Sequence, residues 1–277
     1  MKKSIIWLAS YPKSGNTWVR IFLTNYLLNA SKPVSINQVH RLGLGDAIAK
    51  LYEKVAPGPF DRHVPAEVLP LREAVLRGIV ANNADVNFVK THCIRRIIEG
   101  YDMFPEKYTR ASIYIVRNPL DMVLSYARHH GQTVEDAVIS IGHPDNATIG
   151  HGDAVVTPMS SWSEHVNAWI GWAPWPQVVI RYEDLLSNPE QEFSKVLKLI
   201  GVPVEEERLK RAIRNASFKE LKAQEEAHGF VERPGESDKF FASGKSGIWK
   251  EKLPKELAEQ VLRDHRPTMK RFGYIES

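Results

Sequence analysis

The segment "WLASYPKSGNTW" (residues 7–18) joins a run of apolar residues to an amphipathic pattern through a turn that contains Pro, Lys and Gly. The apolar run predicts a buried strand, and the pattern after Gly15 predicts a helix. The start of such a helix offers free backbone N–H groups and a positive dipole end, and Lys13 adds a charge. The turn is therefore expected to bind a phosphate or sulfate group.

This turn differs from the P-loop of nucleoside-triphosphate enzymes. The G-x-x-x-x-G-K-[ST] spacing is absent, because Lys13 precedes Gly15 instead of following a second glycine. A kinase that uses ATP is thus disfavoured, although Lys13, Gly15, Asn16 and Thr17 would still supply charge and hydrogen-bond donors to an anion. The alternative is an ordinary strand–helix turn with a solvated lysine.

Strand-like and helix-like patterns alternate along the rest of the chain. Alternation of this kind predicts an α/β fold: a single domain over residues 1–277 with a central parallel sheet flanked by helices. Long segments without a clear period are expected to form lids or binding loops. The predicted strands cover residues 4–9, 86–89, 112–116 and 177–182, and the clearest helices cover 17–28 and 189–200. The segments outside this pattern are 31–85, which holds irregular and helical pieces rich in Pro, 142–158, which is loop-like, and 228–248, which shows no clear period.

Composition excludes several classes of protein. The 277 residues carry 37 Lys and Arg against 33 Asp and Glu, a formal charge of +4 that disfavours a nucleic-acid-binding protein. The single cysteine, Cys93, rules out an intrachain disulfide and favours a reducing, cytoplasmic location. The apolar run at residues 5–9 is shorter than a signal core, and no later run has the ~18 apolar residues of a membrane span.

Five short motifs occur in a specific order over roughly residues 4–250. They are "YPKSGNTW" (11–18), "VKTH" (89–92), "IVRNPLDMVLSY" (115–126), "IRYEDL" (180–185) and "SF" (217–218). In that order and spacing the chain resembles the cytosolic-type sulfotransferases, which use 3′-phosphoadenosine 5′-phosphosulfate (PAPS). The resemblance implies transfer of a sulfuryl group to an acceptor hydroxyl or amine by in-line displacement, without a metal or a covalent intermediate, with 3′-phosphoadenosine 5′-phosphate (PAP) as the product.

The resemblance assigns the catalytic roles to three residues. His92 matches the general base of the family, and histidine suits this role because its ordinary pKa of ~6.5 lies near working pH. Lys13 matches the lysine that contacts the 5′-phosphate and the bridging oxygen of the donor. Lys90 matches a second lysine that stabilises charge on the transferring group.

The same resemblance implies the remaining donor-binding residues. Trp18 and Phe218 would stack on the adenine with Tyr182 nearby, and Arg117 and Ser125 would bind the 3′-phosphate that distinguishes PAPS from ordinary adenine nucleotides. Ser217 stands beside Phe218 in its motif. The 5′-phosphosulfate loop would be completed by Ser14, Gly15, Asn16 and Thr17.

The chain departs from the family at the C-terminal motif, which is usually R-K-G-x-x-G-D-W-K. The stretch here is "ASGKSGIW" (242–249), so Ala242 and Ser243 replace two basic residues that contact the 3′-phosphate. Gly244 is retained, Ser243 could donate a hydrogen bond, and Lys245 is close enough in sequence to replace the lost charge. The dimerisation pattern K-x-x-x-T-V-x-x-x-E of the family is not visible, so the oligomeric state stays open.

Two other functions and several acceptors are compatible with the sequence. The alternatives are a nucleoside or nucleotide kinase and a non-catalytic nucleotide-binding module. The acceptor-binding loops are expected within residues 31–85, 127–158 and 228–243, where no single type of side chain dominates. A small phenol, a sterol-like alcohol, a carbohydrate and a peptide-derived natural product all remain open as small-molecule acceptors.

Overall fold

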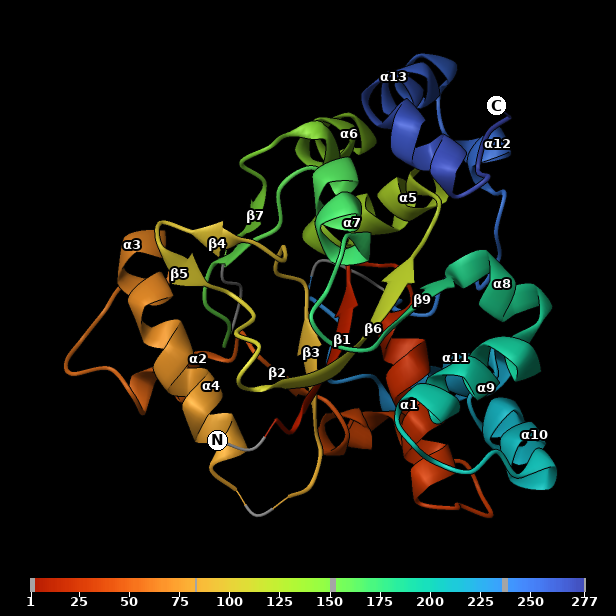
Figure 1. The fold of residues 1–277 in the computed structure, drawn as a ribbon. Coiled ribbons are helices and arrows are strands. Elements are labelled where there is room, and N and C mark those ends of the chain that lie inside the picture. The colour runs from red at the N-terminus through yellow and green to blue at the C-terminus, as the bar shows by residue number, and fades with distance from the viewer. Residues whose placement is uncertain (1–2, 83, 150–152, 236–238, 277) are drawn as a thin grey trace.

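Five parallel strands form the central sheet of the computed structural model, which describes residues 3–82, 84–149, 153–235 and 239–276. The strand order is β2-β3-β1-β6-β9, with β1 in the middle (Figure 1). The strands are β1 (Ile5–Ser10), β2 (Leu44–Gly45), β3 (Asn87–Thr91), β6 (Thr109–Val116) and β9 (Gln177–Arg181).

Strand β1 is buried along its whole length because helices cover both faces of the sheet. Successive side chains of a strand point to opposite faces. Accordingly Ile5 and Trp7 pack into one hydrophobic core, and Ile6 and Leu8 pack into the other. This two-sided burial explains why the strand is a continuous apolar run rather than an alternating one.

The helices divide between the two faces of the sheet (Figure 1). One face is covered by α1 (Asn16–Leu27), α9 (Pro189–Leu199), α10 (Glu206–Asn215) and α11 (Phe218–His228). The other is covered by α4 (Arg72–Val80), α5 (Pro119–His130), α6 (Val134–Gly142), α7 (Trp162–Ile170) and α13 (Lys255–Arg271). The shorter elements are η1 (Ile36–Arg41), α2 (Ala49–Glu53), α3 (Pro65–Val68), η2 (Leu69–Leu71), β4 (Ile97–Ile98), β5 (Tyr101–Asp102), β7 (Ala147–Thr148), β8 (Thr157–Pro158), α8 (Tyr182–Ser187) and α12 (Trp249–Lys252).

The structure confirms the α/β fold with a parallel sheet flanked by helices. All four predicted strands form, and the predicted helices correspond to α1 and α9 within one residue at each end. The two-residue edge strand β2 was not predicted, and the segment 142–158 holds the short hairpin β7–β8 that its sequence did not indicate. The described residues between His228 and Trp249 form no helix or strand.

The strand order places a crevice at the carboxyl end of β1. From β1 the chain reaches β3 on one side and later β6 on the other, and the carboxyl ends of all three strands lie at the same edge of the sheet. In open α/β sheets, ligands bind where the strand order reverses in this way. The residues that follow these strands are therefore the first place to look for a site.

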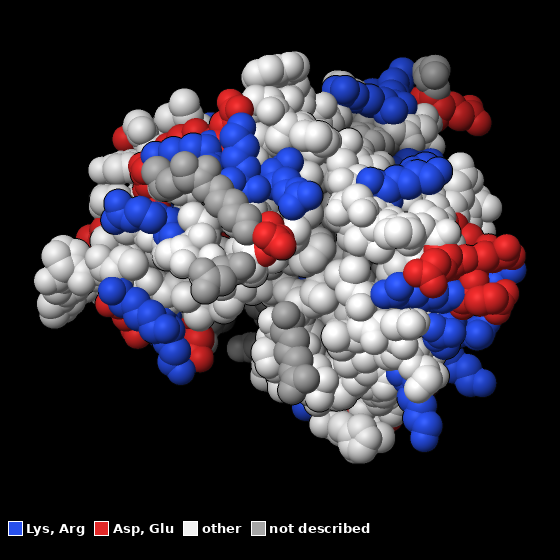
Figure 2. Space-filling view, turned by 60° about the horizontal axis from the view of Figure 1, so that its bottom comes forward, with Lys and Arg blue, Asp and Glu red and all other residues white. Residues whose placement is uncertain are grey.

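The surface carries charges of both signs. Figure 2 shows basic and acidic side chains intermingled over the face in view, in keeping with the near balance of 37 Lys and Arg against 33 Asp and Glu. Within the described ranges, no helix has both the length and the apolar character that crossing a membrane requires.

Candidate functional site

The turn between β1 and α1 (residues 11–15) has an unusual backbone. Lys13 has a φ of +66° and Gly15 a φ of +103°, both in the left-handed region that favours glycine. A non-glycine residue held there carries strain, which concentrates at functional sites. A Cβ atom on Gly15 would lie 2.8 Å from Cδ2 of Tyr182, so only glycine lets the turn and the Tyr182 ring come this close.

Side-chain hydrogen bonds fix the start of α1 over the end of β1. The Asn16 amide donates to the carbonyl oxygen of Leu8 at 2.8 Å and accepts from Nε of Arg20 at 3.1 Å. Arg20 also donates to Oγ1 of Thr17 at 3.0 Å. The free N–H groups at the helix start are thus held toward the crevice, as an anion-binding turn requires.

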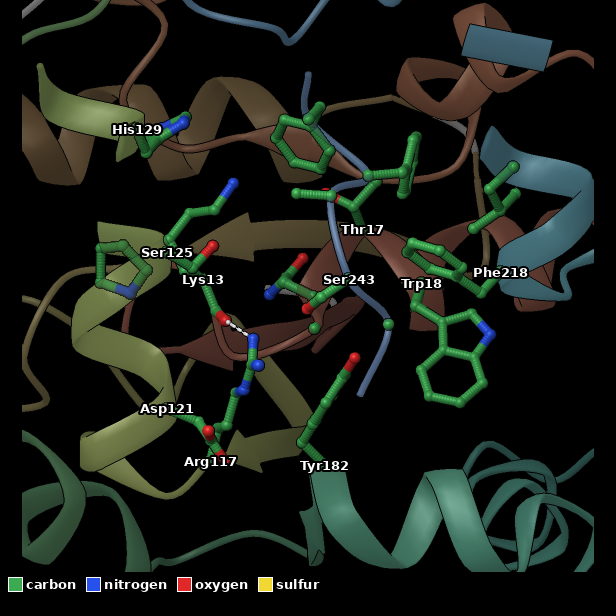
Figure 3. A pocket seen from close by; sticks show the side chains of 18 of the residues that line it. Lys13, Thr17, Trp18, Arg117, Asp121, Ser125, His129, Tyr182, Phe218 and Ser243 are labelled. Carbon is green, nitrogen blue, oxygen red and sulfur yellow. Dashed lines mark hydrogen bonds between the residues drawn. The ribbon is translucent and has the colours of Figure 1, made fainter. Parts of the chain in front are cut away.

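A cavity of about 440 Å³ opens in front of this turn. Lys13, Thr17, Trp18, Arg117, Ser125, Tyr182, Phe218 and Ser243 lie around it in Figure 3. Of the predicted site residues, only Ser14 and Lys245 do not line the cavity: Ser14 is fully buried within the turn, and Lys245 is exposed. The other predicted residues that line it are Gly15, Asn16, Lys90, His92, Ser217 and Gly244.

One end of the cavity is aromatic. Trp18 and Phe218 lie together at this end, with Tyr182 below them (Figure 3), and the rings of Trp18 and Tyr182 pack edge-to-face with centroids 5.9 Å apart. Gly244 presses against Phe218, because a Cβ atom there would lie 2.4 Å from the ring. These faces provide a flat apolar slot of the kind that a nucleotide base occupies.

Next to Tyr182, on the side away from Trp18, lies Arg117, which follows β6 (Figure 3). Its guanidinium donates to the carbonyl oxygen of Lys13 at 3.1 Å, the dashed line in Figure 3, and to that of Lys245 at 3.4 Å. It also lies 4.3 Å from the centre of the Tyr182 ring. Nε of Arg117 is buried without a hydrogen-bond partner among the described residues. Arg117 therefore ties three segments together and keeps a donor unsatisfied.

Asp121 has a role that the sequence analysis did not identify. Its carboxylate accepts hydrogen bonds from the backbone N–H groups of Gly247 at 2.6 Å and Trp249 at 3.0 Å. It thereby anchors the segment before α12, which carries Ser243 and Gly244, to helix α5. The sequence does show that Asp121 is an acidic residue in the first turn of a predicted helix after Asn-Pro. It does not indicate the hydrogen-bond partners of Asp121, which lie 126 and 128 residues away.

His92 directly follows β3, and its imidazole ring is neutral, with the proton on Nδ1. Its Nδ1 lies 2.7 Å from the carbonyl oxygen of Ser10, and because a carbonyl oxygen only accepts, Nδ1 carries the proton and Nε2 keeps its lone pair. Burial and the charge of Lys90 hold the pKa of His92 well below its usual range, so the ring is neutral at pH 7.

Two partly buried lysines line the cavity with His92. Burial, together with the neighbouring charges of Lys90 and Arg128, lowers the pKa of Lys13 to about 7. Burial also lowers the pKa of Lys90. Lys13 has its ammonium 3.7 Å from the centre of the Phe240 ring. Both pKa shifts arise because the site gathers positive charge away from water, and a bound anion would reverse them.

A second cavity of about 260 Å³ adjoins the first. Lys90, His92, His129, His130 and Thr148 line both cavities. The remaining wall of the second cavity combines acidic, hydroxyl and aliphatic side chains. His92 and Lys90 therefore lie where the two cavities meet.

Arg20, His129 and Glu232 were also missed. Glu232 lines the larger cavity and forms a two-point ion pair with Arg20, with N–O distances of 2.8 and 2.6 Å. Nδ1 of His129 is buried without a hydrogen-bond partner in the described part of the chain. The sequence gives no motif that indicates a role for these three residues. Arg20 and Glu232 in particular are 212 positions apart, so their ion pair could not be predicted from spacing.

Comparisons with known proteins agree on one family. The family model for the sulfotransferase domain matches residues 3–273. Sulfotransferase 1A1 of Canis lupus familiaris is 24% identical over 287 residues, covering 96% of this chain and 83% of that protein. Flavonol 3-sulfotransferase of Flaveria bidentis is 25% identical over 274 residues, covering 92% and 78%.

Solved structures show the same fold. Retinol dehydratase in complex with androsterone and the inactive cofactor PAP superposes with a TM-score of 0.65 and 17% identity, over 98% of this chain and 82% of that one. A mouse sulfotransferase in complex with PAP gives a TM-score of 0.59 at 19% identity, over 98% and 86%.

Proposed function

This chain belongs to the sulfotransferase domain family and is a sulfotransferase, and on that premise we propose that His92 activates an acceptor hydroxyl or amine to attack the sulfuryl group of PAPS. The observation that carries the proposal is the meeting of three groups at one cavity. His92 and Lys90 at the end of β3 and Lys13 of the β1–α1 turn all line it.

The residues of the larger cavity fit a nucleotide with two anionic ends. Lys13, Lys90 and Arg117 line it, and two buried donors on lining residues, Nε1 of Trp18 and Nε of Arg117, have no partner among the described residues. Unsatisfied buried donors are costly and indicate a missing acceptor. Two of the similar solved structures are complexes with PAP, which supports PAPS as the donor here.

In this arrangement each part of the donor has its own partners. Trp18, Phe218 and Tyr182 would hold the adenine, and Arg117 with Ser125 would hold the 3′-phosphate. Ser217 and Ser243, which line the same cavity, would contribute hydroxyl groups. The turn, from Lys13 to Thr17, would hold the 5′ end.

The donor supplies a sulfuryl group attached to a phosphate leaving group. Nε2 of His92 would take the acceptor proton, for which the neutral ring and its Nδ1–H bond to Ser10 prepare it. Lys13 and Lys90 would stabilise the charge on the leaving and transferring groups from positions fixed before reaction. A cytoplasmic location, indicated by the single cysteine, stays part of the proposal.

The smaller cavity is the proposed acceptor site, because His92 lies where it meets the donor cavity. The acceptor is a small molecule in this proposal, since the cavity measures about 260 Å³. Its side chains do not single out one acceptor class.

Calorimetry with PAP and ATP, followed by a product screen, tests the proposal. We expect PAP to bind at least tenfold more tightly than ATP, since Arg117 and Ser125 recognise the 3′-phosphate that ATP lacks. Mass spectrometry of a small-molecule library incubated with PAPS should then reveal sulfated products that depend on His92. Tighter binding of ATP than of PAP would overturn the donor assignment and favour a kinase.

A further inference from the structure

Glu232 places a negative charge beside the group that should bind the donor. It belongs to the irregular segment between α11 and α12, and its carboxylate accepts from two nitrogens of Arg20 at 2.8 and 2.6 Å. Oε2 of Glu232 also lies 3.5 Å from Oγ1 of Thr17, at the start of α1. Glu232 lines the donor cavity, and Arg20, which does not line it, is buried behind.

The same segment covers a second cationic group of the turn. The ring of Phe240 lies 3.7 Å from the ammonium of Lys13, a cation–π contact. The backbone N–H groups of Phe240 and Phe241 donate to the carboxylate of Glu225 at 2.6 and 2.9 Å, which fixes the position of the ring. Arg20 and Lys13 therefore both have partners from this one segment.

Glu232 is the carboxylate that faces the cations of the cavity. Asp121 also lines it, but both of its oxygens accept hydrogen bonds from backbone N–H groups. Burial alone would raise the pKa of Glu232, but the charges of Lys90 and Arg20 hold that pKa well below its usual range. Glu232 is thus an anion at every working pH.

We propose that Glu232 is an intramolecular counter-ion that holds the place of the donor's 5′ group and is displaced by it, which leaves Arg20 to pair with the ligand. The inference rests on the proposed function, since it requires the 5′ end of the donor at Thr17. Two anions cannot share these partners, because like charges a few ångströms apart in a partly buried site repel each other strongly. The binding energy of the donor would therefore include the cost of moving Glu232.

The test compares two nucleotides that differ only at the 5′ position. PAP and adenosine 3′-phosphate are titrated into the wild type and into Glu232→Gln, which keeps the size of the side chain and removes its charge. We expect roughly tenfold tighter binding of PAP by the variant and less than about twofold change for adenosine 3′-phosphate. Weaker or unchanged PAP binding overturns the proposal, because Glu232 would then be a structural tether or an inert neighbour.

Glu225→Gln is the matched control. Glu225 holds the same segment through Phe240 and Phe241 but does not line the donor cavity. This substitution should loosen the segment without changing the charge in the cavity. The affinities for PAP and for adenosine 3′-phosphate should therefore change by the same factor. If Glu225→Gln raised the preference for PAP as much as Glu232→Gln does, segment mobility would explain the effect and the proposal would fail.

The role of Arg20 is tested in the background that lacks the competing charge. Arg20→Gln combined with Glu232→Gln should bind PAP about tenfold more weakly than Glu232→Gln alone, with little change for adenosine 3′-phosphate. Equal PAP affinities would remove Arg20 from the ligand site. Failure of PAP to bind the wild type more tightly than ATP would instead reject the proposed function, so the two failures are separable.

Discussion

Nδ1 of His92 lies 2.7 Å from the carbonyl oxygen of Ser10, the last residue of β1. The contact joins the ends of two adjacent parallel strands, β1 and β3. It fixes the tautomer of the ring, because the carbonyl can only accept the Nδ1 proton. The strand pairing of the sheet therefore sets which nitrogen of His92 is free to accept a proton.

The first prediction concerns this nitrogen. His92→Ala should lower kcat by ~10²–10⁴ because it removes the general base. The dissociation constant of PAP should stay within about twofold, since the nucleotide is held elsewhere in the cavity. Steady-state kinetics and calorimetry measure the two quantities separately. A parallel loss of PAP affinity would make His92 a structural residue.

The second prediction follows from the pKa of Lys13, which is about 7 in the free protein. Lys13 is charged below that pH and loses its charge as the pH rises. Because a bound anion favours the charged form, PAP binding at pH 8 should take up close to one proton and weaken as the pH increases. Calorimetry in buffers with different ionisation enthalpies counts the protons.

Lys13→Arg serves as the control for proton uptake. The guanidinium of arginine stays charged over this pH range, so the variant should bind PAP without taking up that proton. Proton uptake that persists in Lys13→Arg would assign the titration to another group and contradict the prediction.

The sequence predicted those parts of the site that are local. Lys13 and Thr17 lie within one strand–turn–helix unit, and Lys90 and His92 lie at the end of β3 and directly after it, so two short motifs were enough to place these residues at one cavity. The fold could also be predicted from local patterns. Because β1 is buried on both faces of the sheet, its sequence is a continuous apolar run that is recognisable without knowledge of distant contacts. The two-residue strand β2 (Leu44–Gly45) is too short to leave a period.

The parts that were missed depend on contacts between distant segments. Glu232 reaches Arg20, and Asp121 reaches Gly247, across 212 and 126 positions. Lys245 was predicted, from its nearness in sequence, to replace a lost basic residue. Its side chain is exposed outside the cavity and only its carbonyl oxygen meets Arg117, so a direct role in donor binding stays a prediction.

The third prediction compares two glycines of one motif. A Cβ atom on Gly244 would lie 2.4 Å from the Phe218 ring, whereas one on Gly247 would meet nothing within 4 Å. Both residues have a positive φ, of +59° and +81°, so alanine should cost about 1–2 kcal/mol of folding free energy at either position. Only Gly244→Ala should also weaken the binding of PAP, by roughly tenfold, because the Phe218 ring must shift to make room for the added Cβ atom.

Denaturant unfolding and PAP titration of the two variants measure both effects. Equal PAP affinities for Gly244→Ala and Gly247→Ala would show that Phe218 can shift without loss, and would remove it from the adenine site. The shared conformational cost makes Gly247→Ala a control for strain, and the difference in affinity isolates the contact with the ring.

The last prediction concerns the 3′-phosphate, where Ala242 and Ser243 replace the basic pair of the family. If Arg117 carries most of the recognition, Arg117→Ala should erase the preference for PAP over adenosine 5′-phosphate, which charge-assisted hydrogen bonds of ~1.5–3 kcal/mol each would supply. Lys245→Ala should leave that preference nearly unchanged because its side chain is exposed. Ala242 and Ser243 line the cavity, so Ala242→Arg with Ser243→Lys should tighten PAP. Calorimetry of these variants with both nucleotides tests the prediction. An unchanged preference for PAP in Arg117→Ala would reject the role of Arg117. A lost preference in Lys245→Ala would mean that the side chain of this lysine folds over the bound ligand.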